Sequence, residues 1–219
     1  MNVLPWFTPT VLIAMALSGA LVDATPATYR MPIARWWDQA ELTVLVLEPL
    51  PLVDHGSVRL DAAFLSAIKG SIAAWKTAID NHGSSDIAGH VAFDVRVVPK
   101  GEFGAAEIAE ADIVVASGRM EASAFGGTAT MTQTPCVIAN TPPTSGGYNF
   151  RVAIHEFGHC LGLGHPVDFQ PDVDVMAYGP GLCVSNLDLL GLHESFGPAF
   201  GRTPAPYVDL PDADYETYC

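Results

Sequence analysis

The hydrophobic residues of the chain fall into several short apolar runs, separated by polar, glycine-rich and proline-rich segments. Short runs rich in β-branched residues and bounded by such segments are typical of buried strands. A polar stretch of small, β-prone residues at 126–132 is typical of an edge strand instead. The pattern therefore predicts five strands, at Leu42–Leu47, Val91–Val98, Asp112–Ala116, 126–132 and Cys136–Ala139.

Three longer stretches carry apolar residues at helical spacing. The first lies within 61–83 and places one apolar face at Phe64, Ile68, Ile72, Trp75 and Ile79. Two more helices are predicted at 149–161 and 185–196, the last with Ser185 as its N-cap. The order strand, helix, strands, helix, helix predicts an α+β fold, with one mostly parallel sheet and the long helices packed on it.

The two ends of the chain differ from this body. The first charged side chain is Asp23, and the short apolar run at Val11–Leu17 before it predicts a secretory leader over 1–24. The alternative is an uncleaved membrane anchor. Residues 25–34 read as a short entry segment, and 201–219 as an extended tail with several acids and prolines.

Composition limits the function classes. Hydrophobic residues make up 49% of the 219 residues, enough for a packed core, which excludes a disordered chain. The formal net charge is −14, which argues against a nucleic-acid partner, since phosphate binding needs a basic face. We expect one compact domain that acts as a monomer.

Four cysteines are present: Cys136, Cys160, Cys183 and Cys219. In an exported chain an even count predicts disulfides, and four cysteines allow three pairings, between which the sequence does not choose. No C-x-x-C pair occurs, so a thiolate zinc site is not predicted.

The most informative segment is His155-Glu-Phe-Gly-His159-Cys-Leu-Gly-Leu-Gly-His165. On a helix, His155 and His159 project from one face and can bind one zinc ion. Glu156 lies beside them, close enough to accept a proton from water on the metal. A straight helix would carry His165 about 9 Å past His159. Gly162 can end the helix with a left-handed residue and return His165 to the site.

This segment matches H-E-x-x-H-x-x-G-x-x-H, the zinc signature of the metzincins, and the chain most resembles the matrixins among them. Asp174-Val-Met176-Ala-Tyr178 resembles the Met-turn of that clan. The resemblance implies a catalytic domain over 35–200 with a twisted, mostly parallel five-stranded sheet and an antiparallel edge strand. It also implies two long helices and a C-terminal helix.

The resemblance further assigns candidate roles. His155, His159 and His165 would bind one catalytic zinc ion, and Met176 would form the hydrophobic floor beneath it. Tyr178 would either act on the transition state or line a specificity pocket. An extended protein or peptide substrate would pair with the edge strand at Gly127, Thr128, Ala129 and Thr130. The acids Asp168, Asp172 and Asp174 either bind calcium or are solvated loop residues.

The sequence therefore predicts a secreted zinc endopeptidase. In this interpretation Glu156 takes a proton from the attacking water and later delivers it to the leaving amine. Two alternatives remain open at this point: a catalytically silent, zinc-stabilised extracellular binding module, and a metal-dependent hydrolase of another substrate class.

Overall fold

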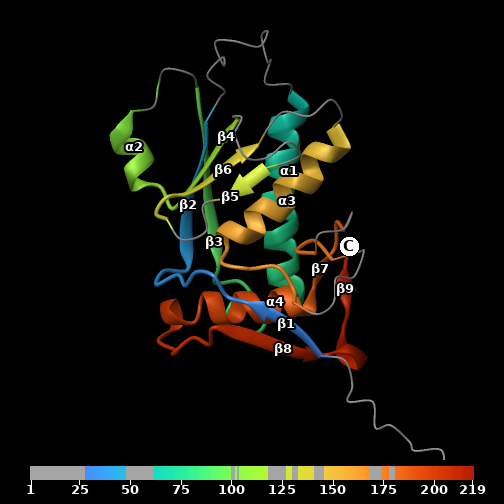
Figure 1. The fold of residues 1–219 in the computed structure, drawn as a ribbon. Coiled ribbons are helices and arrows are strands. Elements are labelled where there is room, and N and C mark those ends of the chain that lie inside the picture. The colour runs from blue at the N-terminus through green and yellow to red at the C-terminus, as the bar shows by residue number, and fades with distance from the viewer. Residues whose placement is uncertain are drawn as a thin grey trace, which may run out of the picture.

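The computed structural model describes residues 28–47, 62–99, 102, 104–117, 127–129, 133–140, 146–167, 174–177 and 181–219. Their fold is α+β, as the sequence predicts (Figure 1). The predicted leader or anchor lies outside these residues. Within them, no helix has the length and apolar character needed to cross a membrane.

One five-stranded sheet forms the centre of the molecule. Its strands are β2 (Glu41–Leu47), β3 (Ala92–Val98), β4 (Ile113–Ser117), β5 (Gly127–Ala129) and β6 (Cys136–Asn140). The spatial order is β3-β2-β4-β6-β5. Neighbours among the first four strands are parallel, and β5 pairs antiparallel with β6 at the edge. The five predicted strands and the antiparallel edge strand are therefore confirmed.

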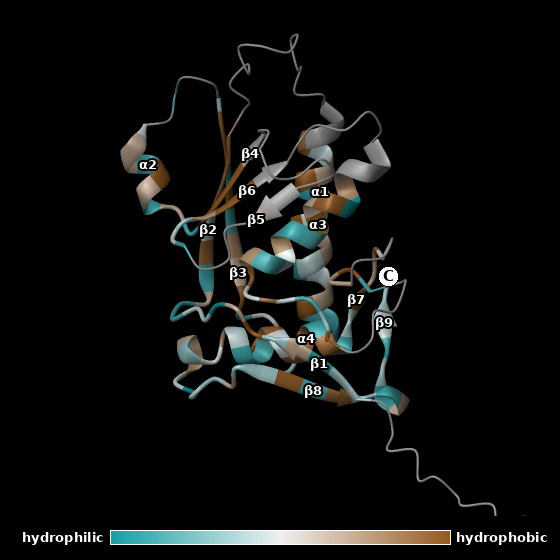
Figure 2. Cartoon of the chain, in the orientation of Figure 1, coloured by the Kyte–Doolittle hydropathy of each residue, from teal (hydrophilic) through white to brown (hydrophobic). Residues whose placement is uncertain are grey.

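Alternation along the strands gives the sheet two covered faces. Val44 and Val46 point to one face with Ile113 and Ile138, where α1 (Ala62–His82) and α3 (Gly146–Cys160) pack. Leu45 and its neighbours on the other face pack against Ile108 of α2 (Ala105–Glu110), a short helix that the sequence analysis did not predict. Figure 2 shows the hydrophobic residues concentrated along the strands between these helices. The predicted third helix is present as α4 (Asn186–Ser195), with Ser185 as its N-cap.

The tail predicted over 201–219 packs against the rest of the described chain. The tail forms β8 (Tyr207–Pro211), which pairs antiparallel with β1 (Thr28–Pro32) of the entry segment. It continues through a 3-10 turn (Asp212–Asp214) to β9 (Thr217–Tyr218), which pairs with β7 (Val184–Ser185). In Figure 1, β1 and β8 lie side by side below α4. Both ends of the described chain therefore belong to the packed body, because Tyr29, Met31 and Leu210 are buried in its core.

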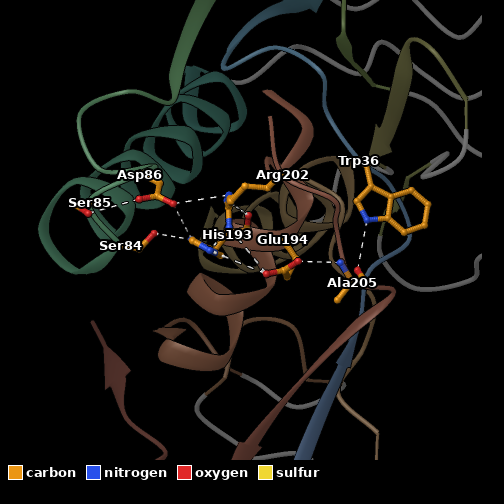
Figure 3. Close-up of polar contacts among 8 residues, drawn as sticks. All are labelled: Trp36, Ser84, Ser85, Asp86, His193, Glu194, Arg202 and Ala205. Atoms are coloured by element: carbon orange, nitrogen blue, oxygen red, sulfur yellow. Dashed lines mark hydrogen bonds and ion pairs between the residues drawn. The ribbon is translucent and has the colours of Figure 1, made fainter. Parts of the chain in front are cut away.

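Side chains also attach the beginning of the tail to α4 (Figure 3). The guanidinium of Arg202, which follows a short 3-10 helix (Pro198–Phe200), donates to the carbonyl oxygen of His193 at 2.5 Å and faces Asp86. The backbone N–H of Ala205 donates to Glu194 at 2.8 Å. The His193 ring bonds Ser84 Oγ at 2.7 Å, so the same cluster joins α4 to the segment after α1.

The cysteines form two disulfides, Cys136–Cys160 and Cys183–Cys219, which link residues 24 and 36 positions apart. The first joins β6 to the last residue of α3 and therefore attaches the end of that helix to the sheet. The second attaches the last residue of the tail to the segment before β7.

Candidate metal centre

The helix α3 carries the first two predicted ligands and is fixed along its length. Trp75 of α1 is fully buried and donates its indole N–H to the carbonyl oxygen of Ile154 at 2.8 Å. The disulfide at Cys160 holds the last turn to β6. Because His155 and His159 are one helical turn apart, this rigid helix presents both rings on one side.

The chain turns back immediately after α3, as Gly162 predicts. Gly162 has φ +106°, a conformation that residues with a Cβ rarely adopt. A Cβ there would also lie 2.4 Å from Ser195 Oγ and 2.6 Å from the carbonyl oxygen of Arg35. The left-handed backbone and the close packing both require glycine, and together they return His165 to the end of α3.

The three histidines converge through their Nε2 atoms. His165 Nε2 lies 3.1 Å from Nε2 of His155 and 3.1 Å from Nε2 of His159. The three ligand atoms lie within 4.8 Å of one another. Three nitrogens bound to one tetrahedral ion at about 2.0–2.1 Å would be about 3.3 Å apart, so the observed spacing fits a single metal ion.

The Nδ1 atoms of two rings show which nitrogen faces the site. His155 Nδ1 lies 2.7 Å from the carbonyl oxygen of Val175, and His159 Nδ1 lies 2.7 Å from that of Leu163. A carbonyl oxygen only accepts, so each Nδ1 carries the proton, and each neutral ring directs the Nε2 lone pair into the site. A proton on His165 Nε2 could form a hydrogen bond to only one of the two Nε2 atoms that lie 3.1 Å away. A cation bound by all three lone pairs satisfies the arrangement.

The pKa values of the rings favour the same neutral state. Burial, and then the neighbouring His155, lowers the pKa of His159 to about 3 and that of His165 to about 4. Burial also lowers the pKa of His155. All three rings are therefore uncharged at neutral pH, and the neutral ring is the form that binds metals.

Glu156 follows the first histidine and is only 7% exposed. Burial raises the pKa of its carboxyl group to about 7 in the metal-free protein. A cation held by the adjacent histidines would lower that pKa again and favour the carboxylate, the form that accepts a proton.

Met176 lies directly against α3 at Gly158, the residue before the second ligand. Its side chain is fully buried, and a Cβ on Gly158 would lie 2.3 Å from Met176 Sδ. Only glycine at position 158 lets the thioether approach the helix backbone this closely. Residues 174–177 thus support α3 at the residue before His159, and the role of Met176 as a hydrophobic floor beneath the ion stays a prediction.

Asp174 is neither a solvated loop acid nor a member of the one metal-binding group found among the described residues. It is fully buried, and its Oδ1 accepts from the backbone N–H of Met176 at 2.6 Å and of Ala177 at 3.2 Å. Its Oδ2 accepts from the hydroxyl of Tyr215 at 2.7 Å. The sequence analysis missed Tyr215, since no motif distinguishes it from the other tail tyrosines.

The remaining predicted site residues are only partly described. Gly127, Thr128 and Ala129 form the edge strand β5, which contacts α3. Thr130, Asp168, Asp172 and Tyr178 lie outside the described residues. Substrate pairing along the edge strand, calcium at Asp168 and Asp172, and the role of the Tyr178 hydroxyl therefore stay predictions.

No protein-family model matches this sequence, and a search of the curated proteins finds no match either. The chemistry of the site therefore rests on its own residues, and these fit one divalent metal ion held by three neutral imidazoles. Glu156 directly follows the first of these histidines in the chain.

Proposed function

We propose that the protein is a secreted, zinc-dependent endopeptidase that resembles the matrixins. The observation that carries this proposal is the convergence of three Nε2 atoms, two of them on rings whose Nδ1 protons are held by backbone carbonyl oxygens. Glu156 directly follows the first of these ligands.

Zinc is the ion that this donor set favours. Three imidazoles without a fourth protein ligand are typical of catalytic zinc, whereas structural zinc sites are usually closed by four protein ligands. Among the described residues, the group that can hold a metal consists of the three histidines alone. When bound, zinc would polarise both the attacking water and the scissile carbonyl group.

The side chains and carbonyl oxygens around the ion have distinct roles in this proposal. The three histidines bind and orient the ion, and the carbonyl oxygens of Val175 and Leu163 keep two of the rings in the correct tautomer. Glu156 accepts the proton of the attacking water and delivers it to the leaving amine. Its partly enclosed position removes competing solvent from the carboxyl group.

An extended peptide is the substrate that the surroundings of the site favour. The edge strand β5 contacts α3, and its outer side has no strand partner among the described strands. A substrate strand can add to such an edge through backbone hydrogen bonds, which bind peptides of many sequences. This arrangement supports a peptidase over a metal-dependent hydrolase of small molecules.

Two disulfides support an exported protein, because disulfides persist in oxidising compartments. Together with the leader predicted over 1–24, they favour an extracellular site of action.

The decisive experiment separates metal binding from catalysis. We expect Glu156→Ala to retain about one zinc per chain, since the three ligands remain, and to lose peptidase activity by about 10²–10⁴-fold. His159→Ala should lose both zinc and activity. Glu110→Ala, which changes an exposed glutamate on α2, is the matched control and should behave as the wild type.

Zinc is measured by elemental analysis, and activity by mass-spectrometric identification of cleavage sites in a denatured protein mixture. A Glu156→Ala variant that cleaves at the wild-type rate would refute the proposed base. A wild-type protein that binds zinc and cleaves no peptide would support the silent binding module instead.

A further inference from the structure

One peptide unit of the Met-turn is held from both of its sides. The carbonyl oxygen of Val175 accepts the Nδ1 proton of His155 at 2.7 Å. The N–H of the same peptide unit, on Met176, donates to Asp174 Oδ1 at 2.6 Å. A peptide unit is planar, so the group that orients its N–H also orients its C=O. Asp174 therefore sets the direction of the carbonyl that holds His155.

Asp174 is in turn held by the C-terminal tail. Tyr215 donates its hydroxyl to Asp174 Oδ2 at 2.7 Å, while Oδ1 bonds the two backbone N–H groups of the turn. The carboxyl group is fully buried. Without the Tyr215 hydroxyl, Oδ2 would lose that donor in an environment that water does not reach, which leaves a buried acceptor unsatisfied at a cost in free energy. A rotation of the carboxyl group toward another donor would relieve that cost and release the bonds of Oδ1.

The backbone around Tyr215 is anchored on both sides. Before it, the carbonyl oxygen of Asp214 accepts from the Asn186 side chain at 2.6 Å. After it, the backbone N–H of Glu216 donates to the Asn186 side chain, its carbonyl oxygen accepts from the Asn186 N–H, and Cys219 is linked to Cys183. The Tyr215 ring also packs edge-on against Tyr29 of β1, with 5.1 Å between the ring centres. The hydroxyl is thus presented to Asp174 by a rigid segment.

We infer that Tyr215 is a positioning residue of the metal centre, which orients His155 through Asp174 and the Val175–Met176 peptide unit. The inference rests on the metal site of the proposed function and adds the C-terminal tail to it. The tail is a part of the centre rather than an appendage, although it lies 60 residues beyond the first ligand, at positions 215 and 155.

The test compares two single-atom deletions in the full chain. Tyr215→Phe removes the hydroxyl that bonds Asp174. Tyr218→Phe is the matched control, because Tyr218 lies in the same tail and also donates to a carboxylate, that of the exposed Glu216. Outer hydrogen-bond partners of metal ligands typically change metal affinity by 10–100-fold. Through two intervening groups, we expect Tyr215→Phe to weaken zinc binding by about tenfold, and Tyr218→Phe to leave it unchanged.

Two further measurements distinguish positioning from general stability. The visible spectrum of the cobalt-substituted protein reports the ligand geometry, and it should change in Tyr215→Phe only. In the metal-free protein, amide hydrogen exchange at Met176 and Ala177 should be faster in Tyr215→Phe and unchanged in Tyr218→Phe.

A second variant tests the next link. Asp174→Asn should also weaken zinc binding, and the double variant with Tyr215→Phe should lose less affinity than the product of the two single losses, because both act on one relay. If the loss of zinc affinity in the double variant equals the product of the two single losses, the inference is overturned. So would a Tyr215→Phe protein with wild-type zinc affinity and an unchanged cobalt spectrum, even if its melting temperature falls.

These readouts do not depend on peptide cleavage. If the wild type binds zinc but hydrolyses no peptide, the proposed function fails, and the affinities and spectra still decide the role of Tyr215. If the wild type binds neither zinc nor cobalt, the metal centre and this inference are both overturned.

Discussion

The two histidines of α3 are supported in parallel ways that differ in what they depend on. His159 Nδ1 bonds the carbonyl oxygen of Leu163, four residues later, and the N–H of that peptide unit, on Gly164, donates to Pro32 of β1 at 2.8 Å. His155 Nδ1 bonds the carbonyl oxygen of Val175, 20 residues later, whose peptide unit is held by Asp174.

The difference lies in the chemical groups that form each support. The support of His159 consists of backbone groups, which side-chain substitutions leave in place. The support of His155 passes through the Asp174 carboxyl group and the Tyr215 hydroxyl, which single substitutions remove. Chain geometry therefore secures one ligand, whereas the other depends on particular side chains. Both supports end in segments outside 35–200, the range that the resemblance implies for the catalytic domain.

The largest expected effect comes from breaking the turn that carries the backbone support. Gly162→Ala combines a left-handed backbone with close contacts to Ser195 and Arg35, so it should destabilise the fold by about 2–4 kcal/mol. Gly201→Ala is the control, because Gly201 has φ +72° but a Cβ there would meet no atom within 4 Å. It should lose only the conformational part, about 1 kcal/mol. Urea unfolding measures both, and equal losses would show that the contacts at Gly162 contribute nothing.

A smaller effect is expected where the backbone support meets β1. A Cβ on Gly164 would lie 3.0 Å from the carbonyl oxygen of Pro32, so Gly164→Ala must displace β1 by a few tenths of an ångström. We expect about 1 kcal/mol of lost stability and zinc affinity reduced by less than about tenfold. Gly104→Ala meets an oxygen at the same 3.0 Å, but on the flexible Glu107 side chain, and should cost less. If Gly164→Ala binds zinc as tightly as the wild type, then β1 does not help to hold His159.

The last effect depends on pH and concerns a carboxyl group next to the side-chain support. Asp188 is fully buried, and burial followed by the nearby Asp174 raises its pKa well above the ordinary value. A raised pKa in the folded state gives stability that is complete below about pH 4 and is lost as pH rises through the folded-state pKa. Asp188→Asn keeps an acceptor for the Ser185 N–H and does not titrate. Its stability relative to the wild type should therefore rise with pH, by at most about 1.4 kcal/mol per pH unit.

Denaturant unfolding of the metal-free proteins from about pH 2.5 to 8, a range that extends below the ordinary pKa of an aspartate, checks this expectation. Asp209→Asn is a control of opposite sign, because the hydrogen bond from Arg30 lowers the pKa of Asp209. That variant should lose stability relative to the wild type as pH rises from the acid side. A difference between Asp188→Asn and the wild type that stays constant with pH would show that Asp188 does not titrate as stated.

The centre of the metal site could be predicted from the sequence because its determinants are local. The four-residue spacing of His155 and His159 specifies one helical face, and a glycine three residues later allows the chain to reverse. The four parallel strands of the sheet were predictable for a similar reason, since each carries its own short apolar run that includes β-branched residues.

The supports of that site, in contrast, were decided by the tertiary structure. Tyr215 and Asp174 are 41 residues apart, and β1 pairs with β8 in a register that joins Thr28 to Pro211. The tail alone is acidic and proline-containing, and its apolar positions become buried only when β1 and α4 are already present to cover them. The cysteine pairing was open for the same reason. The sequence alone determines which residues can bind the metal, because neighbouring residues fix their geometry. Which carbonyl oxygens and which tail residue hold those ligands depends on contacts between distant segments, and these exist only in the folded chain.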